Sequence, residues 1–136
     1  MKIFIDASAL VAYYNVDDLH HVEASEAFRK IEKGEIPLTR FFTTDYILDE
    51  TVTFIECILN RHELALSVGE ALLTSPFTTL LRIDEESFRE AWNYFKDNKG
   101  YSFTDCTSFT IMKKLGITNA FTFDKHFKSA GFQTFP

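Results

Sequence analysis

The feature that most constrains the fold is a regular alternation between short apolar segments and longer segments with helical periodicity. The short segments are rich in β-branched and aromatic residues, and five of them have the character of strands: residues 2–5, 40–44, 77–83, 120–123 and 132–135. Apolar spacing of three and four positions predicts helices over residues 8–14, 21–33, 45–62, 63–74, 84–97, 104–115 and 124–129. Strands that alternate with helices form parallel βαβ units with helices on both sheet faces. The sequence therefore predicts an α/β fold.

The size of the chain fits one domain over residues 1–136. The longest unbroken apolar run, residues 9–14, is far shorter than the ~20 residues that cross a bilayer. Asp6 interrupts the only apolar stretch near the start, so we expect no secretory leader. We therefore expect a cytoplasmic protein without membrane contact, in which Cys57 and Cys106 are small buried residues and not a disulfide.

Two carboxylates come directly after predicted strands. Asp6 follows the strand over residues 2–5, and Asp124 follows the strand over residues 120–123. The carboxyl ends of parallel strands form the ligand-binding edge of an open α/β sheet, so both carboxylates should emerge at one edge. Each also begins a predicted helix, and taken alone each reads as a helix N-cap. The two roles are compatible, because one oxygen can cap while the other meets a cation.

Two further acids lie on predicted helices. Glu50 shares a stripe with Ile47 and Phe54, whereas its neighbour Asp49 lies on the polar side. A charge on the semi-buried side of a helix is costly unless it is paired or bound to metal, which makes Glu50 the better candidate. The alternative is a glutamate at the edge of the core that reaches out to water. Asp105 lies in the first turn of a helix, where the helix dipole alone favours an anion.

Four carboxylates that gather without an arginine partner repel one another unless they take up protons or bind a cation. Oxygen ligands with no cysteine or histidine at metal-binding spacing favour Mg²⁺ or Mn²⁺ over zinc. Such ions activate water and neutralise charge on a phosphodiester during hydrolysis. The pattern thus predicts a metal-dependent hydrolase that acts on phosphodiesters.

The net charge of −6 is unusual for a protein that acts on nucleic acid. The four candidate ligands account for four of these six negative charges. Residues 98–136 carry five lysines and only two acids, both of them candidate ligands. RNA is therefore not excluded as a substrate, although a mildly acidic solvated surface explains the same composition.

Four segments together resemble the acidic motifs of the PIN-domain proteins, particularly the VapC-like group. The segments are residues 3–10 (IFIDASAL), 48–51 (LDET), 102–106 (SFTDC) and 122–127 (TFDKHF). The resemblance spans about residues 2–135 and implies a single-domain α/β/α sandwich around a mostly parallel five-stranded sheet. It also implies endoribonuclease activity that depends on Mg²⁺ or Mn²⁺ and, in the toxin subgroup, a cognate antitoxin and homodimerisation.

Carried over by position, the resemblance assigns the acidic quartet to Asp6, Glu50, Asp105 and Asp124 as catalytic and metal-binding residues. It assigns supporting hydroxyls to Ser8 and Thr104. Two departures, Cys106 and Phe109, stand where family members often carry a small residue, so local packing differs there. Neither departure removes a carboxylate.

Residues around the fourth motif offer further candidates. Lys125 and Lys128 are possible RNA phosphate contacts, although plain solvated lysines need no function. His20, His21 and His126 could act as general bases, but surface or capping roles suit them better. The 15 phenylalanines could stack bases, yet most of them are expected in the core.

The leading hypothesis is an RNA-cleaving enzyme, the toxin of a toxin–antitoxin pair. One alternative is an RNA-processing PIN nuclease outside such a pair. Another is a phosphatase with Asp6 as nucleophile, but such sites usually have a second aspartate two residues on, where this chain has Ser8. The last is a non-catalytic PIN-like module that binds protein and keeps one structural ion.

Overall fold

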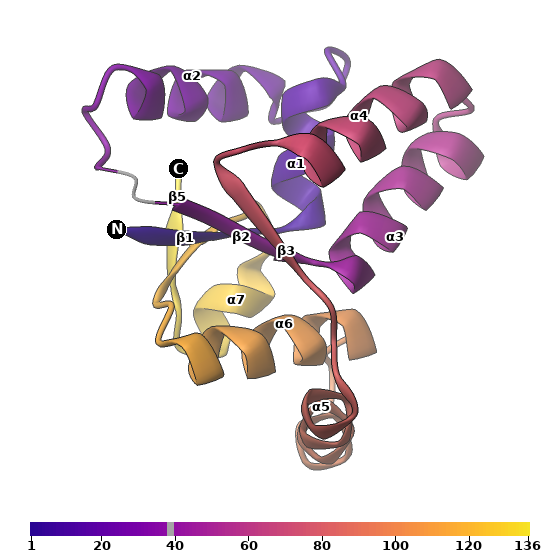
Figure 1. The fold of residues 1–136 in the computed structure, drawn as a ribbon, viewed down its shortest axis with the longest axis vertical. Coiled ribbons are helices and arrows are strands. Elements are labelled where there is room, and N and C mark those ends of the chain that lie inside the picture. The colour runs from indigo at the N-terminus through magenta and orange to yellow at the C-terminus, as the bar shows by residue number, and fades with distance from the viewer. Residues whose placement is uncertain (38–39) are drawn as a thin grey trace.

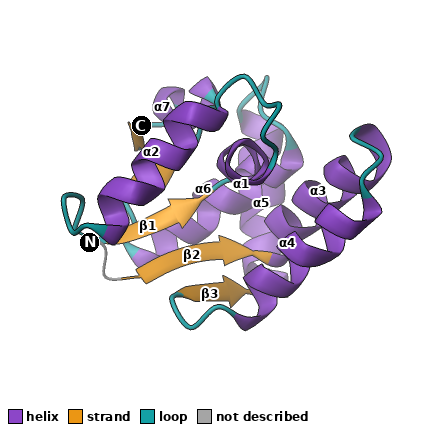
Figure 2. Cartoon of the chain, turned by 90° about the horizontal axis from the view of Figure 1, so that it is seen from above, coloured by secondary structure: helices purple, strands orange, loops and turns teal. Residues whose placement is uncertain are grey.

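The computed structural model describes residues 1–37 and 40–136. Its centre is a five-stranded sheet with strand order β3-β2-β1-β4-β5. Every neighbouring pair of strands is parallel, and Figure 2 shows β1, β2 and β3 side by side with the same direction. The strands are β1 (Lys2–Ile5), β2 (Arg40–Thr44), β3 (Thr78–Leu81), β4 (Asn119–Phe121) and β5 (Gln133–Phe135).

Helices cover both faces of the sheet (Figure 1). Helices α1, α2, α3 and α4 lie on one side, and α6 and α7 lie on the other, with α5 packed on α6. Their bounds are α1 (Ala7–Tyr14), α2 (His21–Glu32), α3 (Asp45–Thr53), α4 (His62–Thr74), α5 (Glu85–Asp97), α6 (Phe103–Leu115) and α7 (Lys125–Ser129). The predicted α/β/α sandwich with a five-stranded sheet is confirmed.

The middle of the sheet is buried on both faces, which explains the unbroken apolar run in β1. Ile3 and Phe4 are fully buried, as is Phe121 in the neighbouring strand β4. On the α6 side, Phe109 is fully buried among the rings of Tyr94, Tyr101, Phe127 and Phe132. This core holds the carboxyl ends of β1 and β4 rigidly, where the candidate carboxylates emerge.

One predicted helix is wrong. Residues 45–62 were expected to form a single helix, but α3 ends at Thr53 and continues as a π-helical turn, η1 (Phe54–Ile58). Asn60 then adopts the left-handed conformation, with φ 56°, and α4 starts at His62. The spacing of apolar residues does not reveal this break, because a polar residue such as Asn60 fits both a continuous helix and a turn between two helices. Asparagine does tolerate the left-handed region better than most residues, which suits it to end a helix.

Two smaller expectations are also corrected. The strand predicted over residues 120–123 is β4 (Asn119–Phe121), so Asp124 follows a two-residue connection and does not follow the strand directly. Cys57 is exposed and not buried, because it lies on the outer side of η1. Cys106 is buried as predicted, and burial raises the pKa of its thiol to about 11. No helix in the described part of the chain combines the length and apolar character needed to traverse a bilayer.

Candidate active site

One cavity of about 300 Å³ lies where the carboxyl ends of β1 and β4 meet helices α3 and α6. Its lining includes all four sequence-predicted carboxylates: Asp6, Glu50, Asp105 and Asp124. These residues come from four separate parts of the chain, so only the fold brings them together. Asp18 adds a fifth acid, and the described lining residues include no lysine or arginine. The cavity therefore has a strongly negative electrostatic potential in the absence of a cation.

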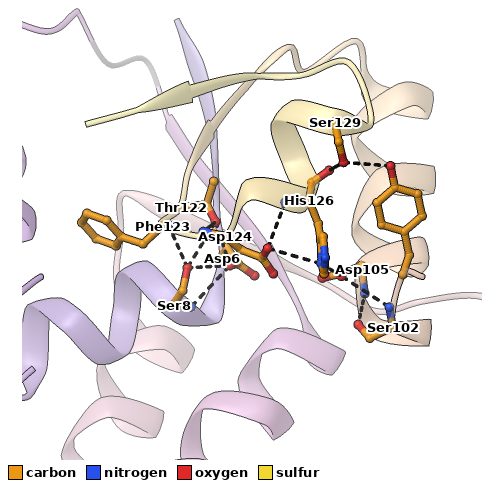
Figure 3. Close-up of polar contacts among 10 residues, drawn as sticks. Asp6, Ser8, Ser102, Asp105, Thr122, Phe123, Asp124, His126 and Ser129 are labelled. Carbon is orange, nitrogen blue, oxygen red and sulfur yellow. Dashed lines mark hydrogen bonds and ion pairs between the residues drawn. The ribbon is translucent and has the colours of Figure 1, made fainter. Parts of the chain in front are cut away.

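Asp6 is the most deeply buried of the four acids, with 5% of its surface exposed. Its Oδ2 atom accepts hydrogen bonds from the Ser8 hydroxyl at 2.7 Å and the Thr122 hydroxyl at 2.9 Å (Figure 3). Burial raises the pKa of Asp6 above its ordinary value, although these two hydroxyls act in the opposite direction. The hydroxyls fix the orientation of a carboxylate that burial would otherwise disfavour in its charged form.

The same hydroxyls tie the segment after β4 to the start of α1. The Ser8 Oγ atom accepts a hydrogen bond from the Phe123 backbone N–H at 3.0 Å. The Thr122 Oγ1 atom accepts one from the Asp124 backbone N–H at 2.9 Å. Asp124 in turn caps α7, since its Oδ1 atom accepts from the His126 N–H at 2.9 Å. Asp6 likewise caps α1, and both N-cap predictions are confirmed.

Asp105 is held by a capping box at the start of α6. The Ser102 hydroxyl accepts from the Asp105 N–H at 3.0 Å, and the Asp105 carboxylate accepts from the Ser102 N–H at 3.4 Å. The residue is 8% exposed, and burial raises the pKa of Asp105, with a further rise from the charge of Asp124. The dipole of α6 stabilises the negative charge of Asp105. Asp105 also lines the cavity, as its predicted role as a metal ligand requires.

His126 joins Asp105 to Asp124. Its Nδ1 atom lies 3.2 Å from Asp105 Oδ2 and 3.3 Å from Asp124 Oδ1. Its ring packs edge-on against Tyr101, whose hydroxyl hydrogen-bonds the Ser129 hydroxyl at 2.9 Å (Figure 3). The sequence favoured a surface or capping role, and that prediction is wrong, because the imidazole is part of the acidic cluster. The only sequence signal was its position two residues after Asp124 in a helix too short for periodicity.

Glu50 faces the same cavity from α3, but it is exposed at the cavity mouth and not semi-buried as expected. Partial desolvation, and then the charges of Asp6, Asp105 and Asp124, raise the pKa of Glu50 to about 7. The neighbouring Asp49 is absent from the described lining, and its Oδ1 atom accepts a hydrogen bond from the Thr53 hydroxyl. The choice of Glu50 over Asp49 as the residue that faces the site therefore agrees with the geometry.

The other candidate residues from the sequence differ in whether they lie at the cavity. Thr104 does not line the cavity in the described structure, and Ser102 provides the hydroxyl at this helix start. Lys125 and Lys128 are exposed on α7, beside the cavity in sequence and free to reach a ligand. His21 Nδ1 lies 2.8 Å from the Ala12 carbonyl and joins α2 to α1. Thr122, which the sequence analysis did not single out, is the second hydroxyl on Asp6.

The donor set fits a hard divalent cation. Asp105, Asp124 and His126 each present one ligand atom, and these atoms lie within 4.8 Å of one another. Asp6 and Glu50 add carboxylates in the same cavity. The pKa values of Asp6, Glu50 and Asp105 are all raised, first by burial and further by the charges of neighbouring carboxylates. A bound cation removes this repulsion.

A parallel sheet of this order, with a cluster of carboxylates at its carboxyl edge, defines an α/β protein with a candidate cation site. The chain belongs to the PIN-domain family, whose model matches residues 3–133. A Mycobacterium tuberculosis protein, 23S rRNA-specific endonuclease VapC20, is 33% identical over 135 residues, which cover 96% of this chain and 95% of that protein. A VapC ribonuclease from Archaeoglobus fulgidus is 28% identical over 120 residues, covering 86% and 74%.

The fold is shared with a solved relative. The crystal structure of Mycobacterium tuberculosis VapC20, described as a sarcin–ricin loop cleaving toxin, matches with a TM-score of 0.86 and 30% sequence identity. The match covers 96% of this chain and 95% of that one. The resemblance inferred from four short acidic segments is therefore confirmed across almost the whole chain.

Proposed function

We propose that this chain is a VapC-like endoribonuclease, a hydrolase of RNA phosphodiester bonds that depends on Mg²⁺ or Mn²⁺. The observation that carries the proposal is the convergence of Asp6, Glu50, Asp105 and Asp124 on one cavity that no lysine or arginine among its described lining residues neutralises. Family membership and the names of the relatives support the same activity. VapC20 is named for 23S rRNA, so large-subunit ribosomal RNA is the first substrate to test.

In this mechanism Asp105, Asp124 and His126 would hold the cation, with Asp6 and Glu50 as further carboxylates in the same cavity. A bound cation would supply an activated water and would offset charge on the phosphodiester. Ser8 and Thr122 hold the Asp6 carboxylate in one orientation. Ser102 holds the backbone of Asp105, so that its carboxylate cannot turn out of the cavity. Glu50, with a pKa of about 7, is partly protonated near neutral pH, and a bound cation would favour its carboxylate form. Lys125 and Lys128, in the helix that Asp124 caps, are the residues proposed to contact RNA phosphates.

A matched pair of variants tests the proposal. Glu50→Gln removes a carboxylate that faces the cavity, whereas Asp49→Asn removes the adjacent carboxylate, which does not. With ribosomal RNA and Mn²⁺, we expect Glu50→Gln to lose at least about a hundredfold in cleavage rate, since even outer-shell changes around a metal cost 10–100-fold. Asp49→Asn should cleave like the unmodified protein. Absence of cleavage with either ion, or equal rates for the two variants, would refute the metal-nuclease role.

We also propose that the chain is the toxin of a toxin–antitoxin pair, acting in the cytoplasm as a homodimer. The name of VapC20 as a toxin supports this, and so do exposed apolar side chains that a partner could cover. They form two groups, Phe88, Trp92 and Phe95 on α5, and Ile58, Leu66 and Leu73 across η1 and α4. Light scattering should give twice the chain mass, and induced expression should arrest growth unless a co-expressed antitoxin is present. A processing nuclease would cleave RNA without arresting growth.

A further inference from the structure

The cavity that holds the carboxylates has a second wall of different chemistry. Val11, Phe54, Phe123 and His20 line the same cavity as the acids. The rings of His20 and Phe123 lie face to face, with centroids 4.4 Å apart and planes inclined by 6°. Cation binding and orientation of the carboxylates use none of these side chains. The wall therefore requires a separate explanation.

These rings remain accessible to a ligand. Phe54 is 39% exposed, and the side chain of His20 is 39% exposed. Single exposed apolar residues are ordinary on protein surfaces. Three rings around one cavity that also contains convergent polar groups are instead typical of a ligand site. The ligand must then present a flat apolar face to this wall and a charged group to the opposite one.

The aromatic wall is built into ordered backbone. The His20 N–H donates to Asp18 Oδ1 at 2.8 Å, and the Asp18 N–H donates to the Asn15 carbonyl at 3.0 Å. These turns fix His20 between α1 and α2. Phe54 begins the π-helical turn η1, one helical turn after Glu50, and such turns are frequent at functional sites. The wall is therefore formed before the ligand arrives.

We propose that the His20–Phe123–Phe54 wall stacks an unpaired nucleobase of the RNA, beside the phosphodiester that the acidic wall receives; this inference rests on the proposed ribonuclease function. The base is the only part of a nucleotide with apolar faces, and bases stack well on Phe and His rings. A base inside a duplex has both faces covered by its neighbours. The wall therefore accepts only an unpaired base, which agrees with the description of the relative VapC20 as a sarcin–ricin loop cleaving toxin.

The test compares two ligands that differ only in the base. Adenosine 5′-monophosphate and ribose 5-phosphate carry the same phosphate, so their affinities in Mn²⁺ buffer isolate what the base contributes. We expect the nucleotide to bind on the order of tenfold more tightly, which lies within the range measured for one stacked base. 2-Aminopurine riboside 5′-monophosphate reports the contact directly, because stacking on a ring quenches its fluorescence.

His20→Ala and Phe54→Ala should each reduce the affinity ratio toward one and relieve the quenching, while ribose 5-phosphate binding stays unchanged. Phe77→Ala is the matched control, since Phe77 is 70% exposed and is not among the described lining residues. It should keep both the ratio and the quenching. His20 is exposed enough for its variant to fold, and thermal unfolding checks each protein before titration.

The outcomes separate this inference from the function on which it rests. RNA cleavage together with equal binding of the two monophosphates, or with no binding of either, overturns the base-stacking wall and leaves the nuclease intact. A ratio that persists in both His20→Ala and Phe54→Ala also overturns it. Absence of both RNA cleavage and monophosphate binding would remove the nuclease function as well.

Discussion

Asp6 depends on neighbouring hydroxyls more than the other acids do. Ser8 and Thr122 both donate to its Oδ2 atom, and their hydroxyl oxygens are 3.1 Å apart. Each hydroxyl also accepts a backbone N–H from the segment that carries Asp124. Two small side chains thus set the relative position of two carboxylates that lie 118 positions apart in the sequence.

Thr122→Val tests this role, because it keeps the shape of the side chain and removes the hydroxyl. We expect the cleavage rate to fall by roughly 10–100-fold, as for other outer-shell changes around metal ligands. The free energy of unfolding should fall by about 1–3 kcal/mol, because the Asp6 carboxylate and the Asp124 N–H both lose their partner. Thr122→Ser should restore most of the rate. If the cleavage rate falls only as far as the fraction of folded protein falls, and Thr122→Ser does not restore it, Thr122 has a merely structural role.

The raised pKa of Glu50 predicts how stability depends on pH in the absence of metal. Its folded-state pKa is about 7 against an ordinary 4.5, so the folded state binds the proton more tightly than the unfolded state. The free energy of unfolding must therefore fall as pH rises between about 4.5 and 7. In EDTA, the melting temperature should drop by a few degrees across this window, and Asp6 and Asp105 act in the same direction.

Glu50→Gln isolates the contribution of this residue. The difference in melting temperature between Glu50→Gln and the unmodified protein should be smallest near pH 4.5 and largest above pH 7, in favour of the glutamine variant. For Asp49→Asn, the difference in melting temperature from the unmodified protein should not grow with pH. Parallel curves of melting temperature against pH for Glu50→Gln and the unmodified protein would contradict the raised pKa of Glu50.

The candidate site could be predicted in part from residue types and local position. Asp6 and Asp124 come at or just after the ends of strands, Glu50 shares a helix stripe with apolar residues, and Asp105 lies in the first turn of a helix, so all four could be found without coordinates. Thr122 and His126 could not be found this way, since their contacts cross 116 and 21 positions of sequence. The exposure of Glu50 was also misjudged, because helical spacing gives the side of a helix but not how closely the next layer covers it.

At the level of elements, the sequence predicted the order of the strands and α-helices in the described residues, but neither the turn η1 nor the ends of α3 and β4. The π-helical turn closes with a hydrogen bond from the Leu59 N–H to the Phe54 carbonyl at 3.1 Å. Asn60 follows in the left-handed region, where the chain reverses into α4. Helical spacing continues through both segments, so the pattern of apolar residues could not reveal the break. The turn matters for the site, because it starts at Phe54 on the cavity wall.

Asn60 gives this break a simple test. Asn60→Gly keeps the left-handed backbone accessible and should leave stability unchanged within about 0.5 kcal/mol. Asn60→Val should cost about 1–2 kcal/mol, because a branched side chain clashes in that region. Asn60 is exposed, so loss of packing contributes little. Urea unfolding measures both variants, and equal stability of the glycine and valine forms would argue that the helix does not break here.

Helix α6 connects the core to the site. Phe109, which replaces a commonly small residue, is fully buried, and its ring contacts those of Tyr101 and Phe127. Phe109→Ala should cost about 3–5 kcal/mol, as expected for a buried phenylalanine. Phe109→Leu should cost clearly less, since it leaves a smaller cavity. Thermal and urea unfolding of the two variants would settle the order, and a tolerated alanine would show that this aromatic cluster is not needed for packing.

For the whole molecule, the fold class followed from the strand–helix alternation, because parallel sheets constrain connections so strongly. The exact strand order could not be read from periodicity or from the resemblance, and it comes from the structure alone. Charge was the least informative property of the sequence. The net value of −6 did not exclude RNA, because four of the six negative charges belong to the candidate ligands that the structure places around one cavity.

Cation binding should stabilise the whole fold, because it favours the folded state alone. Addition of Mn²⁺ or Mg²⁺ in excess over its dissociation constant should raise the melting temperature by several degrees, and EDTA should reverse the change. Asp6→Asn should blunt the response, while Asp49→Asn should keep it. An identical melting temperature with and without either ion, measured by calorimetry at pH 7.5, would contradict a divalent site in this cavity.

The strand order has a consequence for how such an enzyme is made. Strand β4 pairs with β1, and Asp124 follows β4, so the fourth carboxylate is among the last parts of this sequence to leave the ribosome. A nascent chain that ends after α6 carries three acids without the hydroxyl of Thr122 that orients Asp6. Such a truncated chain therefore lacks both the fourth carboxylate and a hydroxyl on which the proposed nuclease site depends.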